Sequence, residues 1–165
     1  MNILIVNGPN LNMLGIREPE IYGSNTYKNL CSLIEDHADK LGVNVEIYQS
    51  NYEGDLVTKI QDAYFNDVDG IVVNLAAYTH TSVALLDAIN AVSIPAVEVH
   101  ISAVEERESF RKISYVRPAC IDTIWGHGFQ GYLEAMDLLV DLKKTGKLAA
   151  GEGKNSASNA ADMMD

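Results

Sequence analysis

Short apolar runs of strand length recur along the chain, and longer segments with helix-type spacing separate them. The first, third and fourth runs are nearly continuous and rich in β-branched residues, which is typical of central parallel strands covered on both faces. The second run alternates between apolar and polar residues and fits an edge strand, and the fifth is the weakest. The five runs span residues 3–6, 43–48, 70–73, 96–99 and 120–124.

Four segments between and after these runs predict helices. Residues 27–41 place Leu30, Ile34 and Ala38 on one face, and Gly42 supplies a C-terminal stop. The other three predicted helices span residues 55–65, 81–92 and 129–142. Because strands and helices alternate along the chain, we predict an α/β fold with a doubly wound parallel sheet.

Two further segments fit neither pattern. Residues 11–25 are too long and too polar for a routine connection between a strand and a helix, so we expect a lid there. Residues 146–165 are rich in small and polar residues and predict a disordered C-terminal tail. The remaining length, residues 1–145, suits a single domain.

Composition and charge narrow the classes of function. The chain has 165 residues, 47% of them hydrophobic and 21% charged, which is an ordinary globular balance. A formal net charge of −11 argues against nucleic acid as a partner. The same charge repels anions at long range, so any carboxylate substrate must be held by a local arginine or by backbone N–H groups. No apolar run approaches the ~20 residues that span a membrane, and the N-terminus does not resemble a signal peptide. Cys31 and Cys120 form no motif, so we expect a cytoplasmic protein without membrane contacts.

Polar residues follow the apolar runs at the points where the strands end. Asn10 follows the first run, Asn74 and His80 follow the third, and His100 and Ser102 follow the fourth. Ligands of open α/β sheets bind beyond the carboxyl ends of the strands. In a five-stranded sheet of order 2-1-3-4-5 the first, third and fourth strands are neighbours, so we expect these residues to meet at one edge.

Glu98 and His100 are two residues apart on a predicted strand, so both side chains point to the same face. A carboxylate in this position can accept a hydrogen bond from one imidazole nitrogen and leave the other for proton transfer. The alternative is a buried ion pair without chemistry.

Two groups of charged residues in connections are candidates for chemistry. Arg17 lies close to Tyr22 in the predicted lid, where an arginine would stabilise a phenolate that acts as a base. A solvated loop is the alternative. Arg107 and Arg111 follow the fourth strand four residues apart, so they could share one side of a helical turn and form a carboxylate clamp. A solvated face is the alternative.

Several cofactor sites are disfavoured by the sequence. It contains no P-loop and no Gly-x-Gly-x-x-Gly motif, and Pro9 removes a backbone donor from the turn where a flavin phosphate would bind. Its histidines have no zinc-type spacing, so no metal is expected.

Taken together, these segments resemble the type II 3-dehydroquinate dehydratases over residues 1–142. The resemblance rests on a long series of motifs in order. They are NGPNLNMLG at 7–15, REP at 17–19, YG at 22–23, QSNYEG at 49–54, YTHTS at 78–82, DAI at 87–89, EVHIS at 98–102, FR at 110–111 and GY at 131–132.

This resemblance implies a flavodoxin-like fold and loss of water from 3-dehydroquinate to give 3-dehydroshikimate through an enolate, without a metal or organic cofactor. Aromatic biosynthesis and quinate breakdown both use this reaction, and both roles fit the sequence. The resemblance also implies a homododecamer built as a tetramer of trimers, in which Asp87 would be lent to the site of a neighbouring subunit.

By the same resemblance, Tyr22 is the base that removes the proton beside the ketone, and Arg17 keeps it ionised. Asn10 would hold a water that stabilises the enolate, and His100, oriented by Glu98, would protonate the departing hydroxyl. The residues expected to bind the substrate are Asn74, His80, Arg111 and the backbone of Ile101 and Ser102.

The sequence departs from the family pattern beside two of these positions. Leu75 and Ala76 stand where the family commonly has a small residue or proline followed by glycine, and Ala103 stands where it usually has asparagine. The connection after Asn74 must therefore either adopt an ordinary backbone conformation or carry strain. These departures leave open an impaired homologue that binds a related cyclic polyol acid.

Overall fold

The computed structural model of the protein describes residues 1–16 and 25–147, apart from the side chain of Glu105. Five strands form one parallel sheet in the order β2-β1-β3-β4-β5, which confirms the predicted topology. They are β1 (Asn2–Asn7), β2 (Asn44–Gln49), β3 (Gly70–Asn74), β4 (Ala96–His100) and β5 (Asp122–Trp125).

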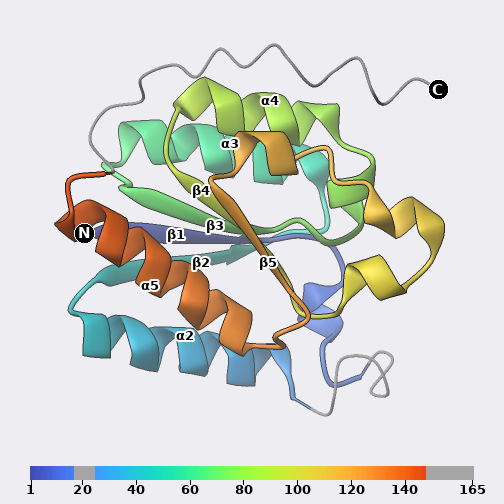
Figure 1. Ribbon diagram of the computed structural model, residues 1–165, viewed down its shortest axis with the longest axis horizontal. Helices are drawn as coiled ribbons and strands as arrows, with labels where there is room; N and C mark the ends of the chain where they lie inside the picture. The colour runs from blue at the N-terminus through green and yellow to red at the C-terminus, as the bar shows by residue number, and fades with distance from the viewer. Residues whose placement is uncertain (17–24, 148–165) are drawn as a thin grey trace.

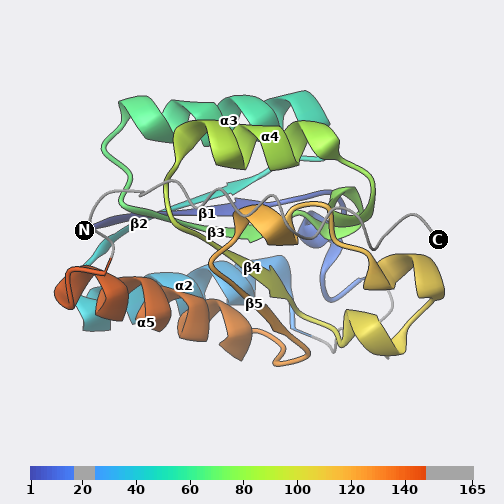
Figure 2. The same cartoon turned by 45° about the horizontal axis from the view of Figure 1, so that its top comes forward.

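Helices cover both faces of this sheet, so the fold is doubly wound. Figures 1 and 2 show helices on both sides of the sheet. One face carries α2 (Tyr27–Leu41) and α5 (Gln130–Lys144), and the other carries α3 (Glu53–Phe65) and α4 (Val83–Val92).

The alternation of side chains along β1 explains why the central strands are apolar throughout. Ile3 and Ile5 pack in the core under α2 and α5, whereas Leu4 and Val6 pack in the core under α3 and α4. Both faces of a central strand are therefore buried, and burial of this apolar area is the main stabilising term. Strand β2 lies at the sheet edge, as its mixed pattern predicted.

Element boundaries differ from the predicted ones where capping groups decide them. Ser82 caps α4 by accepting a hydrogen bond from the N–H of Leu85, so this helix begins at residue 83 and a short 3-10 turn precedes it. Gly54, expected before α3, lies inside the first turn of that helix. The fifth strand begins at Asp122, because Cys120 still belongs to the end of a 3-10 turn.

The predicted lid divides into two parts. Residues 11–13 form the 3-10 turn η1 (Leu11–Met13), and the side chains of Leu11 and Leu14 are buried against the α2 and α5 side of the core. This first part is packed, contrary to the expectation of a lid over the whole of residues 11–25. Residues 17–24 and the tail residues 148–165 lie outside the described residues.

Candidate active site

A pocket lies beyond the carboxyl ends of β1, β3 and β4, where the sequence placed it. The connections after these strands form its walls, and Leu11, Leu14 and Val104 give it an apolar side. The predicted site residues that line it are Asn10, Asn74, His80, His100, Ile101, Ser102 and Arg111. Seven predicted site residues, from the ends of β1, β3 and β4 and the connections that follow them, therefore meet at one edge of the sheet.

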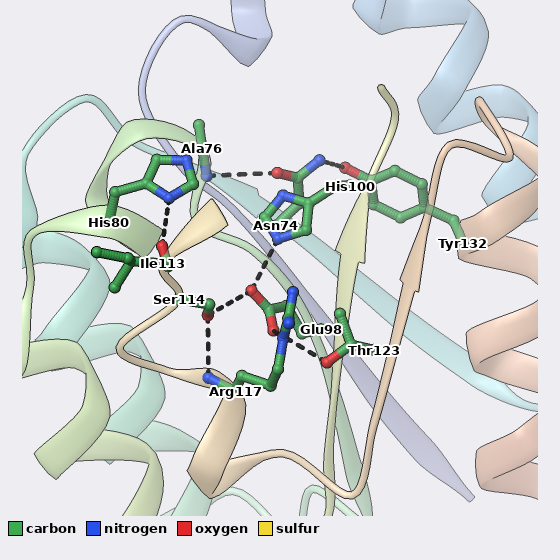
Figure 3. Close-up of polar contacts among 10 residues, drawn as sticks. All are labelled: Asn74, Ala76, His80, Glu98, His100, Ile113, Ser114, Arg117, Thr123 and Tyr132. Carbon is green, nitrogen blue, oxygen red and sulfur yellow. Dashed lines mark hydrogen bonds and ion pairs between the residues drawn. The ribbon is translucent and has the colours of Figure 1, made fainter. Parts of the chain in front are cut away.

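Glu98 and His100 form the predicted pair on β4. The Nε2 atom of His100 lies 2.7 Å from Oε1 of Glu98 (Figure 3). Both side chains are almost fully buried. An ionised carboxylate only accepts hydrogen bonds, so Nε2 of His100 carries a hydrogen. The Nδ1 atom is then the ring nitrogen available for proton transfer.

Three side chains from outside β4 also hold the carboxylate of Glu98. The hydroxyl of Ser114 donates to Oε1 at 2.7 Å, and the hydroxyl of Thr123, the register partner of Glu98 on β5, donates to Oε2 at 3.0 Å. The Nε atom of Arg117 lies 3.6 Å from Oε2. Burial by itself raises the pKa of Glu98. The hydrogen bond and the charge of His100, together with the hydrogen bonds from Ser114 and Thr123, outweigh burial, so the pKa of Glu98 is lowered. Glu98 is therefore ionised at neutral pH.

His80 faces the pocket beside His100, with the two rings nearly parallel and their centroids 6.4 Å apart. Its Nδ1 atom lies 2.6 Å from the carbonyl oxygen of Ile113 (Figure 3), and because a carbonyl only accepts, Nδ1 carries the hydrogen. Burial, with the charges of His100 and Arg111, lowers the pKa of His80 despite the opposing effects of Ile113 and Glu98. His80 is thus neutral at neutral pH, and its Nε2 atom is an acceptor.

Asn10 lies in a left-handed backbone conformation, with φ of 67°, in the connection after β1. Its N–H donates to Oδ1 of Asn51 at 3.0 Å, and Nε2 of Gln49 donates to the same oxygen and to the carbonyl of Gly8. The end of β2 therefore anchors this connection. Gln49 and Asn51 were not predicted as site residues, because individual hydrogen bonds between the ends of neighbouring strands leave no signal in the sequence pattern.

The connection after β3 adopts the strained alternative. Ala76 has a φ of 51°, a conformation that favours glycine, and its N–H donates to Oδ1 of Asn74 at 3.3 Å. The Nδ2 atom of Asn74 donates to the hydroxyl of Tyr132 at 2.8 Å (Figure 3). Leu75 is fully buried in the core, and Ala103 is not among the residues that line the pocket.

The two arginines after β4 do not share a helical turn, so that expectation was wrong. Arg107 lies in extended backbone between the turns η3 (Val104–Glu106) and η4 (Ser109–Lys112), and Arg111 lies within η4. Both form ion pairs with Glu108, and Arg111 does so at 2.8 Å. Of the two, Arg111 lines the pocket.

Four predicted site residues do not line this pocket as described, and one of them, Glu98, supports it through its contact with His100. Arg17 and Tyr22 lie outside the described residues. Asp87 is exposed on α4 and does not line the pocket. Ser114, Thr123 and Arg117 were not predicted; their contact with Glu98 depends on a distant turn and on strand register, and neither is visible in the sequence pattern.

In residues 1–16 and 25–147, no group of three or more His, Cys, Asp or Glu side chains lies close enough to hold a metal ion. Of the helices in these same ranges, none has the length and apolar character to span a membrane.

Comparisons with known proteins agree with one another. The sequence model of the family Dehydroquinase class II matches residues 1–140. A 3-dehydroquinate dehydratase of Clostridium acetobutylicum is 52% identical over 142 residues, which cover 86% of this chain and 98% of that protein. The crystal structure of a type II dehydroquinase from Butyrivibrio crossotus has a TM-score of 0.83 and 53% identity, over 84% of this chain and 97% of that one. A type II dehydroquinase from Propionibacterium acnes has a TM-score of 0.81 at 38% identity, over 85% of this chain and 96% of that one.

Proposed function

The chain belongs to the class II dehydroquinase family, and we propose that the pocket described above is where it removes water from 3-dehydroquinate to give 3-dehydroshikimate. This hydro-lyase activity is supported over that of an impaired homologue, because relatives about half identical along nearly their whole length are dehydratases. The observation that carries the assignment of the pocket is the buried Glu98–His100 pair, which faces a cavity bordered by Asn10, Asn74 and Arg111.

The reaction begins with removal of the proton beside the ketone. We assign this step to Tyr22 as a phenolate, with Arg17 beside it to keep the oxygen ionised. The electron pair of the broken C–H bond forms an enolate. Asn10 holds a water that donates a hydrogen bond to the enolate oxygen, and the anchoring of its connection by Asn51 supports this placement.

The second step is loss of the hydroxyl group. As the enolate re-forms the ketone, the C–O bond breaks, and the proton on Nδ1 of His100 passes to the departing oxygen to give water. The buried negative charge of Glu98 stabilises the imidazolium that carries this proton. The phenol of Tyr22 and the neutral His100 then return to their starting states by exchanging protons with solvent.

The remaining pocket residues suit a hydroxylated cyclic carboxylate. His80 presents Nε2 as an acceptor for a substrate hydroxyl, and Asn74 offers an amide N–H. Arg111 bonds Glu108 through Nε, and the other donors of its guanidinium, with the N–H groups of Ile101 and Ser102, are placed to bind the carboxylate. This local positive charge offsets the net charge of −11.

The test is the absorbance of the conjugated enone product, measured with 3-dehydroquinate and two histidine variants. We expect His100→Ala to lower kcat by about 10²- to 10⁴-fold, the usual contribution of a general acid. The control is His37→Ala, because His37 also pairs with a carboxylate at 2.8 Å, that of Asp137, but does not line the pocket. A His100→Ala enzyme with near-normal kcat would refute the assignment.

We also propose that the chain is cytoplasmic, forms its catalytic domain from residues 1–145 and assembles as a homododecamer, a tetramer of trimers. Two free cysteines suit a reducing compartment, and the family model spans residues 1–140. Exposed large apolar side chains, among them Phe110, Ile121 and Trp125, support self-association. Sedimentation tests the assembly, and a stable, fully active monomer would exclude it.

Asp87 is proposed to complete the site of a neighbouring subunit, since it is exposed and does not line its own pocket. Co-expression of Asp87→Ala and His100→Ala subunits tests this. If each site takes Asp87 from another chain, random mixing restores an intact pair in about a quarter of the sites. Activity no higher than that of either variant alone would contradict the sharing.

A further inference from the structure

The hydroxyl of Tyr132 joins the ends of two neighbouring strands. Tyr132 lies in the first turn of α5 with its side chain fully buried. The Nδ2 atom of Asn74 donates to its oxygen at 2.8 Å, and the hydroxyl donates to Oδ1 of Asn7 at 2.7 Å. Asn7 and Asn74 are register partners and the last residues of β1 and β3.

Both neighbours of Asn74 impose the same orientation on its amide. The backbone N–H of Ala76 can only donate, so the atom facing it must be Oδ1. The hydroxyl of Tyr132 uses its hydrogen on Asn7, so it can only accept from Asn74. Burial raises the pKa of Tyr132 far above its ordinary value, and the hydroxyl therefore keeps this hydrogen.

The geometry points to Tyr132 as a positioning residue, which holds the side chain of Asn74 so that its amide offers an N–H donor to the pocket. Asn74 is 97% buried, so few other orientations are open to it while both contacts persist. Without the hydroxyl, only the longer contact from the N–H of Ala76, at 3.3 Å, still orients the amide, so the turned orientation becomes more accessible. In that orientation a carbonyl oxygen faces the pocket, and it cannot donate to a carboxylate or ketone oxygen. This inference rests on the proposed role of Asn74 in binding the substrate.

The experiment is a double-mutant cycle on steady-state kinetics. We expect Tyr132→Phe to raise KM about tenfold with kcat within about twofold, because a contact made equally in ground state and transition state changes KM alone. In the Asn74→Ala background the same substitution should change KM by less than about twofold, because Tyr132 acts through Asn74. Tyr27→Phe is the matched control: its hydroxyl accepts from Asn7 at 3.4 Å, one link further from Asn74. It should leave KM unchanged.

Each outcome distinguishes the two claims. If Asn74→Ala leaves KM unchanged, the binding role of Asn74 fails and this inference falls with it. If Asn74→Ala raises KM but Tyr132→Phe leaves it unchanged, only the positioning role is refuted. The same holds if Tyr132→Phe raises KM by the same factor in the wild-type enzyme and in the Asn74→Ala variant. Should Tyr132→Phe fail to fold, Asn7→Ala replaces it, because it frees the hydroxyl hydrogen to turn toward Asn74. An unchanged KM in Asn7→Ala then overturns the inference, and a raised KM that vanishes with Asn74→Ala supports it.

Discussion

Gly8 lies where the connection after β1 passes against the connection after β3, and replacing it by alanine tests how far this close approach supports the site. A Cβ atom on Gly8 would lie 2.4 Å from the carbonyl oxygen of Leu75 and 2.5 Å from its carbonyl carbon. An ordinary contact begins near 3.4 Å, so the two backbones must separate by about 1 Å. Because backbone must move, we expect Gly8→Ala to cost about 3 kcal/mol, the upper end for overpacking.

This cost corresponds to a fall in Tm of roughly 6–12 °C for a protein of this size. The displaced segment carries Asn74, whose backbone carbonyl accepts a hydrogen bond from the N–H of Gly8 at 2.8 Å. Because Asn74 lines the pocket, kcat/KM should also fall, by up to about 100-fold. Thermal unfolding followed by circular dichroism and the enone absorbance assay measure both effects. The control is Gly54→Ala, where the new Cβ meets nothing within 4 Å and the helix should gain up to ~1 kcal/mol. If Gly8→Ala keeps the wild-type Tm and kcat/KM, the reasoning from close approach is wrong.

Three further predictions follow from strain and from buried charge. Ala76→Gly removes an alanine from the left-handed conformation and should raise Tm by about 2–4 °C. KM should stay within about twofold, because the contact with Asn74 is already made. A lower Tm would show that packing of the methyl group stabilises the fold by more than the backbone strain destabilises it. Thr123→Val removes a donor from the buried Glu98 and should cost about 1–3 kcal/mol by urea unfolding at pH 7, and an unchanged midpoint would contradict this. The pKa values of His80 and Glu98 are both lowered in the folded protein, so the unfolded chain binds more protons than the folded one. The free energy of unfolding should therefore fall as pH drops below about 6.5, and again below about 4.3. Urea midpoints that stay level from pH 7 to 4 would refute this.

The fold could be predicted from the sequence because its central strands and its helices have local signals. The strands β1, β3 and β4 are buried on both faces and therefore read as continuous apolar runs, and α2 shows its core-facing residues at helical spacing. In a parallel sheet all carboxyl ends meet at one edge. For that reason the polar residues that follow these runs, such as Asn10, Asn74 and His100, could be assigned to one edge of the sheet from the sequence, and the structure brings them into one pocket there.

What only the tertiary structure decided is how those residues are held. Thr123 reaches Glu98 through the register between β4 and β5, and Tyr132 reaches Asn74 across 58 residues of chain. Ala76 keeps a left-handed conformation because the surrounding contacts impose it, against the preference of its own residue type. Hydrophobic periodicity reports which face of an element is buried, but a hydrogen bond between distant side chains leaves no periodic signal. The sequence therefore determined where the site lies, and packing determined which atoms each side chain presents to it.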